Sequence, residues 1–192
     1  MSVVYSLTGY PGTGKFTIAK EMIRQLDARG ETARLVDNHT VSDPILGLVE
    51  LPDDRPLDPR IWDRVRDVGA AVRATIVELS PPEWSFVFTN YLANTATDRE
   101  HYPRLAECAA ARGSVFVPVC LTVELDELLR RTVQPDRVAT HKITNADFTR
   151  ILVTERGMYR PDYEQCLDLD VSALPPADAA AHIIEYADTL RG

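Results

Sequence analysis

The feature that most constrains this chain is a glycine-rich turn near its start. Residues 9–17 read Gly-Tyr-Pro-Gly-Thr-Gly-Lys-Phe-Thr, between an apolar run at 3–7 and a segment with helical periodicity. Glycines let the backbone fold so that consecutive N–H groups point inward, and the following helix adds the positive end of its dipole. The turn predicts a phosphate-binding loop, and the alternative is a strand-to-helix turn without a ligand. Its proposed binding residues are Gly9, Gly12, Thr13, Gly14, Lys15, Phe16 and Thr17.

One position of this loop departs from the usual pattern. A Ser or Thr normally follows the lysine and its hydroxyl ligates Mg²⁺, whereas here Phe16 follows Lys15 and a phenyl ring cannot bind a metal. Thr17 is next in line, and Asp37 offers a carboxylate. We predict that Mg²⁺ is held by Thr17, Asp37 and water. Phosphate binding depends on the backbone and on Lys15, which reaches the β and γ phosphates, so it is less affected than metal binding.

The hydrophobic pattern predicts one α/β domain covering residues 1–192. Because 45% of the residues are hydrophobic, the chain can fill a core of its own. Short apolar runs alternate with helical patterns, which indicates a parallel sheet covered by helices. The expected strands are 3–8, 34–36, 86–89, 115–121 and 166–169, and the expected helices are 15–29, 59–79, 99–112, 124–132, 145–159 and 176–190.

Charge and cysteine content exclude several classes of protein. The net charge is -8 and Lys and Arg do not form a block, which argues against a duplex nucleic-acid partner. Cys108, Cys120 and Cys166 lack any zinc-binding spacing, so we expect reduced thiols in the core. No signal peptide fits the start, and no apolar run approaches the roughly 18 residues of a membrane helix. These features predict a cytoplasmic protein, either monomer or homodimer, without a membrane partner.

The loop and a second motif, Val36-Asp37-Asn38-His39-Thr40-Val41, carry a family resemblance. The chain resembles the P-loop kinases of small metabolites, such as shikimate kinase, gluconate kinase and chloramphenicol phosphotransferase, and also an AAA-family ATPase-like group sharing both motifs. The resemblance implies a P-loop NTPase three-layer sandwich with a five-stranded parallel sheet in the order 2-3-1-4-5. It further implies ATP as phosphoryl donor, a substrate flap at about 42–79 and a helical lid at about 131–145.

A cationic stretch at 130–142 supports the lid independently of the resemblance. By resemblance, Arg131 is the lid-base arginine that covers the adenine, and Arg137 meets the transferring phosphoryl group. Arginine suits both roles because its planar guanidinium donates two parallel hydrogen bonds to phosphate oxygens. The alternative is a solvated helix end that carries basic residues near its C-terminus. His141 and Lys142 are equally compatible with a functional and a structural role.

The acceptor side should lie at the carboxyl ends of the strands. Asp37 follows the second strand and is the best-placed group to accept a hydroxyl proton, although Asp also favours turns and N-caps. His39 fits a structural role slightly better. Asn90 stands where an acidic metal ligand would follow the third strand, and Asp98 reads as an N-cap.

The expected substrate flap is rich in arginine. Arg60 and Arg64 share a helical face that would suit an anionic acceptor, and pairing with Asp63 and Asp67 on a solvent-facing helix is at least as compatible. Trp62 reads as a core residue.

Two main functions are compatible with these features. The first is transfer of the γ-phosphoryl group of ATP to a small-molecule acceptor, with Lys15, Asp37 and Arg137 as catalytic groups. The second is a regulator that binds ATP or ADP without transfer, which the unusual Phe16 and Asn90 would allow. By resemblance in the loop and lid, a toxin-like kinase of sugar nucleotides is a third. ATP is favoured over GTP because residues 144–147 lack the lysine of a guanine-reading motif.

Overall fold

The computed structural model describes residues 1–51, 57–134 and 145–192. Its centre is a five-stranded, entirely parallel sheet in the order β2-β3-β1-β4-β5, as the sequence and its resemblance predicted. All six residues of β1 are buried, and neighbours on both sides hold this central strand in register. The strands are β1 (Val3–Thr8), β2 (Ala33–Val36), β3 (Ser85–Asn90), β4 (Val115–Thr122) and β5 (Leu167–Asp170).

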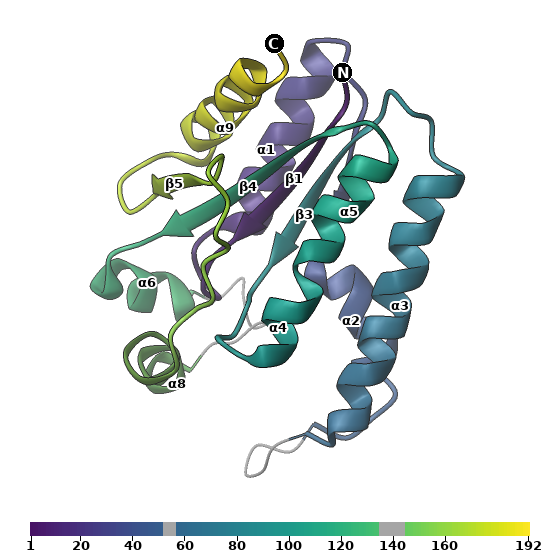
Figure 1. The fold of residues 1–192 in the computed structure, drawn as a ribbon. Helices are drawn as coiled ribbons and strands as arrows, with labels where there is room; N and C mark the ends of the chain where they lie inside the picture. The colour runs from purple at the N-terminus through teal and green to yellow at the C-terminus, as the bar shows by residue number, and fades with distance from the viewer. Residues whose placement is uncertain (52–56, 135–144) are drawn as a thin grey trace.

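Helices cover the two faces of the sheet and form two separate cores. Helices α1 (Lys15–Ala28) and α9 (Pro176–Leu190) pack on one face, where Met22 and Ile183 are fully buried. On the other face lie α3 (Pro59–Glu78) and α5 (Pro103–Ala111), which pack Ile76 and Leu105 against alternate strand residues such as Phe86. Successive strand side chains point to opposite faces. The result is the predicted three-layer sandwich (Figure 1).

The remaining helices lie around the carboxyl end of the sheet (Figure 1). Tyr102 separates two helices where the sequence predicted one, because Pro103 starts a new helix at its first position, where a missing N–H costs least. The sequence also predicted no helix over α2, whose polar residues and internal Pro44 have little helical signature. These elements are α2 (Asn38–Leu46), α4 (Ala96–His101), α6 (Leu125–Thr132), α8 (Ala146–Ile151) and the π-helical turn η1 (Leu152–Arg156).

Two expectations about the chain's apolar residues can be compared with the structure. All three cysteines are free thiols, and Cys108 and Cys120 are buried, but Cys166 is partly exposed and so is not a core residue as expected. Trp62 is 43% exposed on α3, which corrects its prediction as a core residue.

Among the described helices, none has both the length and the apolar character needed to span a bilayer.

Candidate functional site

The glycine-rich loop has the backbone geometry of an anion-binding turn. Gly12 and Gly14 have φ values of 102° and 91°, in the left-handed region where other residues are strained. A Cβ atom on Gly12 would also come within 3.0 Å of the Leu128 side chain. Gly14 caps α1, so the positive end of this helix faces the loop. The sequence therefore places glycine where the turn requires it.

Lys15 lies against the inside of this loop. Its Nζ donates hydrogen bonds to the carbonyl oxygens of Gly9, at 2.6 Å, and Tyr10, at 2.8 Å. Thr13 is almost completely buried, and its hydroxyl donates to the same Tyr10 carbonyl. The ammonium group therefore lies directly against the loop backbone. A bound phosphate would find a cation and a ring of backbone donors within the same few residues.

The first turn of α1 carries the two residues that follow the lysine. Phe16 is 38% exposed, with the Lys20 ammonium 5.6 Å from its ring centroid. Thr17 is also exposed. The ring of Phe16 offers no oxygen, so Thr17 supplies the only hydroxyl of this first turn, Lys15–Ile18.

Asp37 lies at the carboxyl end of β2 and is held by the neighbouring strand. The Thr89 hydroxyl donates to Asp37 Oδ1 and accepts the Asn38 N–H at 3.2 Å. Asp37 is the N-cap residue of α2, but its carboxylate makes no capping hydrogen bond. Its Oδ2 has no hydrogen-bond partner within the described ranges. The carboxylate is therefore oriented by β3 and keeps one oxygen for a ligand.

A cavity of about 170 Å³ opens beside this carboxyl end, between α2, α3, β3 and the α4–α5 segment. Asn90 connects the cavity to the glycine-rich loop, because this residue lines the cavity and its carbonyl accepts the Gly9 N–H at 3.3 Å. The polar and charged residues of the cavity lining include Asn38, Arg66, Arg73, Thr89, Asn90, Asp98 and His101. The loop and the cavity are thus neighbours at one end of the sheet.

Two cations reach the cavity from α3. Arg66 pairs with Asp63, one turn away on the same helix. Arg73 is partly buried and has no hydrogen bond or ion pair with any described residue, and burial lowers the pKa of its guanidinium below the ordinary value. Placing such a charge away from water without a counter-ion is costly. The arrangement favours an anionic ligand.

Asp98 lies at the same cavity and differs from its prediction as an N-cap. Thr95 is the N-cap of α4, and Asp98 is the third residue after it, with its N–H donating to the Thr95 hydroxyl at 3.1 Å. Burial raises the pKa of the Asp98 carboxyl, against the hydrogen bond from Thr95. The sequence prediction therefore started this helix three residues too late, at Arg99 instead of Ala96, and assigned the cap to Asp98 instead of Thr95.

Arg60 and Arg64, for which the sequence left an acceptor-binding and a solvent-facing role open, are not among the residues that line the cavity. Arg60 pairs with Asp58 and Arg64 with Asp67, and both side chains are largely exposed. Both arginines therefore lie on a solvent-facing surface of α3, which was the alternative position considered for them. A helical pattern in the sequence could have identified the correct pair, because Arg66 and Arg73 flank the apolar stripe formed by Val65, Gly69, Val72 and Ile76.

Arg131 joins three parts of the site. Its guanidinium donates to the Val171 and Ser172 carbonyl oxygens at 2.8 and 2.9 Å, and its Nε donates to Glu127 at 2.7 Å. The Thr13 carbonyl lies 3.5 Å from Nη1. Arg131 therefore anchors α6 to the turn after β5, next to the loop. The hydrogen bonds from Arg130 and Arg131 lower the pKa of Glu127 to about 2.

The remaining residues that the sequence singled out are His39, Arg137, His141, Lys142 and Asn90. His39 Nδ1 contacts Asp43 on the next turn of α2, which agrees with a structural role. Arg137, His141 and Lys142 lie outside the described residues, as does most of the expected lid at 131–145. Asn90, which replaces an acidic metal ligand, donates from its side chain to Ser6 at 3.4 Å.

Sequence comparisons assign no family to this chain, whereas structural comparisons define its fold. No protein-family model matches it. No curated protein matches it either. Among solved structures, a candidate kinase from Chloroflexus aurantiacus has a TM-score of 0.67 and 14% identity, with 99% of this chain and 96% of that chain covered.

Two further solved structures contain nucleotide analogues. The Mycobacterium tuberculosis APS kinase CysC, in complex with AMPPNP and APS, has a TM-score of 0.63 and 16% identity over 97% of this chain and 98% of that one. Chaetomium thermophilum Kti12, in complex with ADP-AlF3, has a TM-score of 0.54 and 16% identity over 98% and 97%. At these identities the similarity shows the fold alone, a five-stranded parallel sheet in the order 2-3-1-4-5 flanked by helices, as in P-loop NTPases.

The contacts of Arg131 generate the first prediction. Replacing Arg131 with Ala should lower the free energy of unfolding by about 1–3 kcal/mol, because two carbonyls lose a charged donor. The matched control is Arg130→Ala, whose side chain is 64% exposed and pairs with Glu127, and it should change stability by clearly less than Arg131→Ala does. Urea unfolding of both variants measures the difference. Equal effects would show that Arg131 is not an anchor.

Proposed function

We propose that this protein transfers the γ-phosphoryl group of ATP to a small acceptor that carries a hydroxyl and an anionic group. The observation that carries the proposal is the direct connection between the glycine-rich loop and the polar cavity through Asn90. A phosphotransferase needs donor and acceptor held in line at one place, since positioning and charge stabilisation supply most of the catalysis. This end of the sheet offers both binding places side by side.

The loop supplies the donor half of the reaction. Backbone N–H groups of Gly12, Gly14 and Lys15, together with the start of α1, would bind the phosphates of ATP, and Lys15 would exchange its carbonyl partners for phosphate oxygens. The nucleotide analogues present in the APS kinase and Kti12 structures support this proposal. Arg131 lies beside the loop and next to the turn after β5, and by resemblance it would cover the adenine. We propose Arg137 as the lid residue that meets the transferring group.

The oxygen donors present are compatible with Mg²⁺. Asp37 has one oxygen without a partner, Thr17 has an exposed hydroxyl, and Mg²⁺ usually takes only one or two protein ligands together with phosphates and water. When bound, Mg²⁺ neutralises charge on the phosphate oxygens. Phe16 and Asn90 reduce the number of protein donors below the usual set, so we expect weaker metal binding.

Asp37 and the two cavity arginines supply the acceptor half. The Thr89 hydroxyl holds the Asp37 carboxylate in place, and the other carboxylate oxygen would accept the proton of an acceptor hydroxyl when it is not bound to Mg²⁺. Arg73 and Arg66 would bind the acceptor's anionic group, which gives the partly buried guanidinium of Arg73 a counter-ion that none of the described residues supplies. A carboxylate, phosphate or sulfate group would satisfy this geometry.

A regulator that binds ATP or ADP without transferring a phosphoryl group is the second candidate. It is favoured by one observation, the absence of a metal-binding hydroxyl or acid at Phe16 and Asn90. Tight ATP binding with no ADP formation across a broad panel of acceptors would support this candidate and contradict the transferase.

Nucleotide binding is tested at Lys15. The Lys15→Met variant should bind ATP at least about tenfold more weakly, because a charge-assisted hydrogen bond to phosphate contributes about 1.5–3 kcal/mol. Lys20→Met is the matched control, since Lys20 lies exposed on the same helix, and its ATP affinity should be unchanged. Isothermal titration calorimetry measures the ATP affinity of both variants. If wild-type protein releases no heat with ATP or ADP, the proposed donor site is wrong.

Catalysis is tested at Asp37. The Asp37→Asn variant should keep its ATP affinity within about threefold when titrated without Mg²⁺, since the carboxylate does not contact the loop in the structure. Its kcat should fall by roughly 10²–10⁴-fold, the usual contribution of a positioned proton acceptor. ADP formation, followed with an acceptor from a panel of small hydroxylated anions, measures kcat. An unchanged kcat would remove Asp37 from the proposed mechanism.

Acceptor recognition is tested at Arg73. The Arg73→Met variant should raise KM for the acceptor by about 10–100-fold without changing KM for ATP, because it removes a charged hydrogen-bond donor from the cavity. Arg64→Met removes an exposed charge from the same helix and serves as the control. Steady-state kinetics at varied acceptor concentration measures KM for the acceptor in both variants. Equal acceptor KM values for both variants would show that the cavity does not bind the anion.

A further inference from the structure

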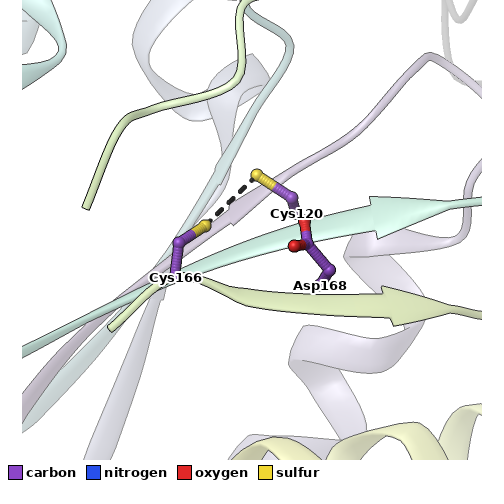
Figure 2. Close-up of side chains that lie close together, drawn as sticks. All are labelled: Cys120, Cys166 and Asp168. Atoms are coloured by element: carbon purple, nitrogen blue, oxygen red, sulfur yellow. Dashed lines mark hydrogen bonds between the residues drawn. The ribbon is translucent and has the colours of Figure 1, made fainter. Parts of the chain in front are cut away.

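Two cysteines that are distant in sequence meet on the sheet. Cys120 belongs to β4, and Cys166 comes directly before β5, 46 residues later. Their Sγ atoms lie 3.4 Å apart, and Figure 2 shows the two side chains pointing toward one another with Asp168 alongside. The third cysteine, Cys108, is on α5 and takes no part in this contact.

The register of β4 and β5 brings the two thiols close together. Cys120 is the direct partner of Asp168 in the parallel ladder between β4 and β5. Cys166 precedes Asp168 by two residues, and side chains two apart along a strand point to the same face. The backbone register therefore places both thiols on the same face of the sheet. A disulfide bond of about 2.0 Å requires the sulfurs to approach by a further ~1.4 Å.

The two thiols differ in solvent exposure and in reactivity. Cys120 is only 2% exposed, whereas Cys166 is partly exposed to solvent. The hydrogen bond from the Cys120 thiol lowers the pKa of Cys166, and the nearby charge of Arg160 acts in the same direction. Thiolates are the reactive form of cysteine. Burial instead raises the pKa of Cys108, which leaves it as a buried and less reactive thiol for comparison.

Asp168 could in principle complete a metal site with the two sulfurs, because the three ligand atoms lie within 4.8 Å of one another. Both of its carboxylate oxygens, however, already accept hydrogen bonds from Arg160, from Nε at 3.0 Å and from Nη2. A metal would have to displace this ion pair and would still have only three protein ligands. The pair of thiols requires no such rearrangement to react with each other.

We propose that Cys120 and Cys166 form a reversible oxidation site, which closes to a disulfide in the presence of a hydroperoxide. The Cys166 thiolate attacks one peroxide oxygen, the O–O bond breaks, and Cys166 becomes a sulfenic acid while hydroxide leaves. The Cys120 sulfur then attacks the Cys166 sulfur, loses its proton and expels the hydroxyl group as water. With hydrogen peroxide, two thiols lose two hydrogens and the peroxide becomes two waters. A dithiol reductant reverses the reaction by thiol exchange.

The disulfide would tie together both ends of the excursion that leaves the sheet after β4 and returns at β5. This excursion contains α6, α8 and η1. Closing such a long loop removes conformational freedom from the unfolded chain, so oxidation should stabilise the fold. The edge strand β5, which pairs only with β4, would become covalently fixed to it.

The test uses the full chain, purified in reductant, desalted and treated with hydrogen peroxide. We expect the intact mass to fall by two hydrogens and peptide mapping to link Cys120 with Cys166, with Tm raised by roughly 5 °C or more. Cys108→Ser should behave in the same way. Cys120→Ser should instead accumulate a Cys166 sulfenic acid that dimedone traps, at least tenfold faster than Cys108 reacts. No step in this test involves nucleotide, so its result is independent of the proposed function.

Three outcomes would overturn the proposal. The first is that peroxide leaves Cys120 and Cys166 unlinked while the wild-type fold is intact by circular dichroism. The second is that Cys108 is oxidised as fast as Cys166. The third is that one Zn²⁺ per chain binds in a titration, is lost in both Cys120→Ser and Cys166→Ser, and blocks oxidation, which would identify a metal site instead.

Discussion

The hydrogen bond from the Gly9 N–H to the Asn90 carbonyl is the contact on which the arrangement of this protein depends. The central strand β1 runs in register with β3 up to the pair Thr8 and Asn90, and the glycine-rich loop starts at the next residue. The loop therefore begins where β3 ends. Because Asn90 also lines the cavity, the same backbone contact that ends the sheet brings the glycine-rich loop beside this cavity.

A second set of contacts holds the opposite side of the loop. Arg131 reaches from α6 to the carbonyls after β5, and Leu128 of the same helix packs so close to Gly12 that a Cβ atom there would be only 3.0 Å from it. The loop thus lies between β3 on one side and α6 on the other. Its conformation is set by tertiary contacts as well as by its glycines, which is the preorganisation that anion binding needs.

The sequence predicted the parts of this protein that depend on local chemistry. The glycine spacing, the buried apolar strands and the alternation of strand and helix led to the correct sheet, with its order supplied by the family resemblance. Contacts between distant segments could not be predicted in this way. Nothing in the spacing of Cys120 and Cys166 indicates that the register of β4 and β5 brings their sulfurs together. Likewise, Asp37 was identified by position, but its hydrogen bond from Thr89 depends on strand pairing.

The sequence pattern did not decide which face of α3 is buried. Arg60 and Arg64 share one helical face, for which the sequence allowed both an acceptor-facing and a solvent-facing position, and Arg66 and Arg73 share another face. Only the packing of Gly69 and Ile76 decides which face is buried, and the buried face determines which cations leave water. A surface arginine with an aspartate partner is nearly neutral in energy, whereas Arg73 is partly desolvated and makes no hydrogen bond or ion pair with the residues that the structure describes. The anionic acceptor proposed above would offset the cost of holding this charge partly out of water.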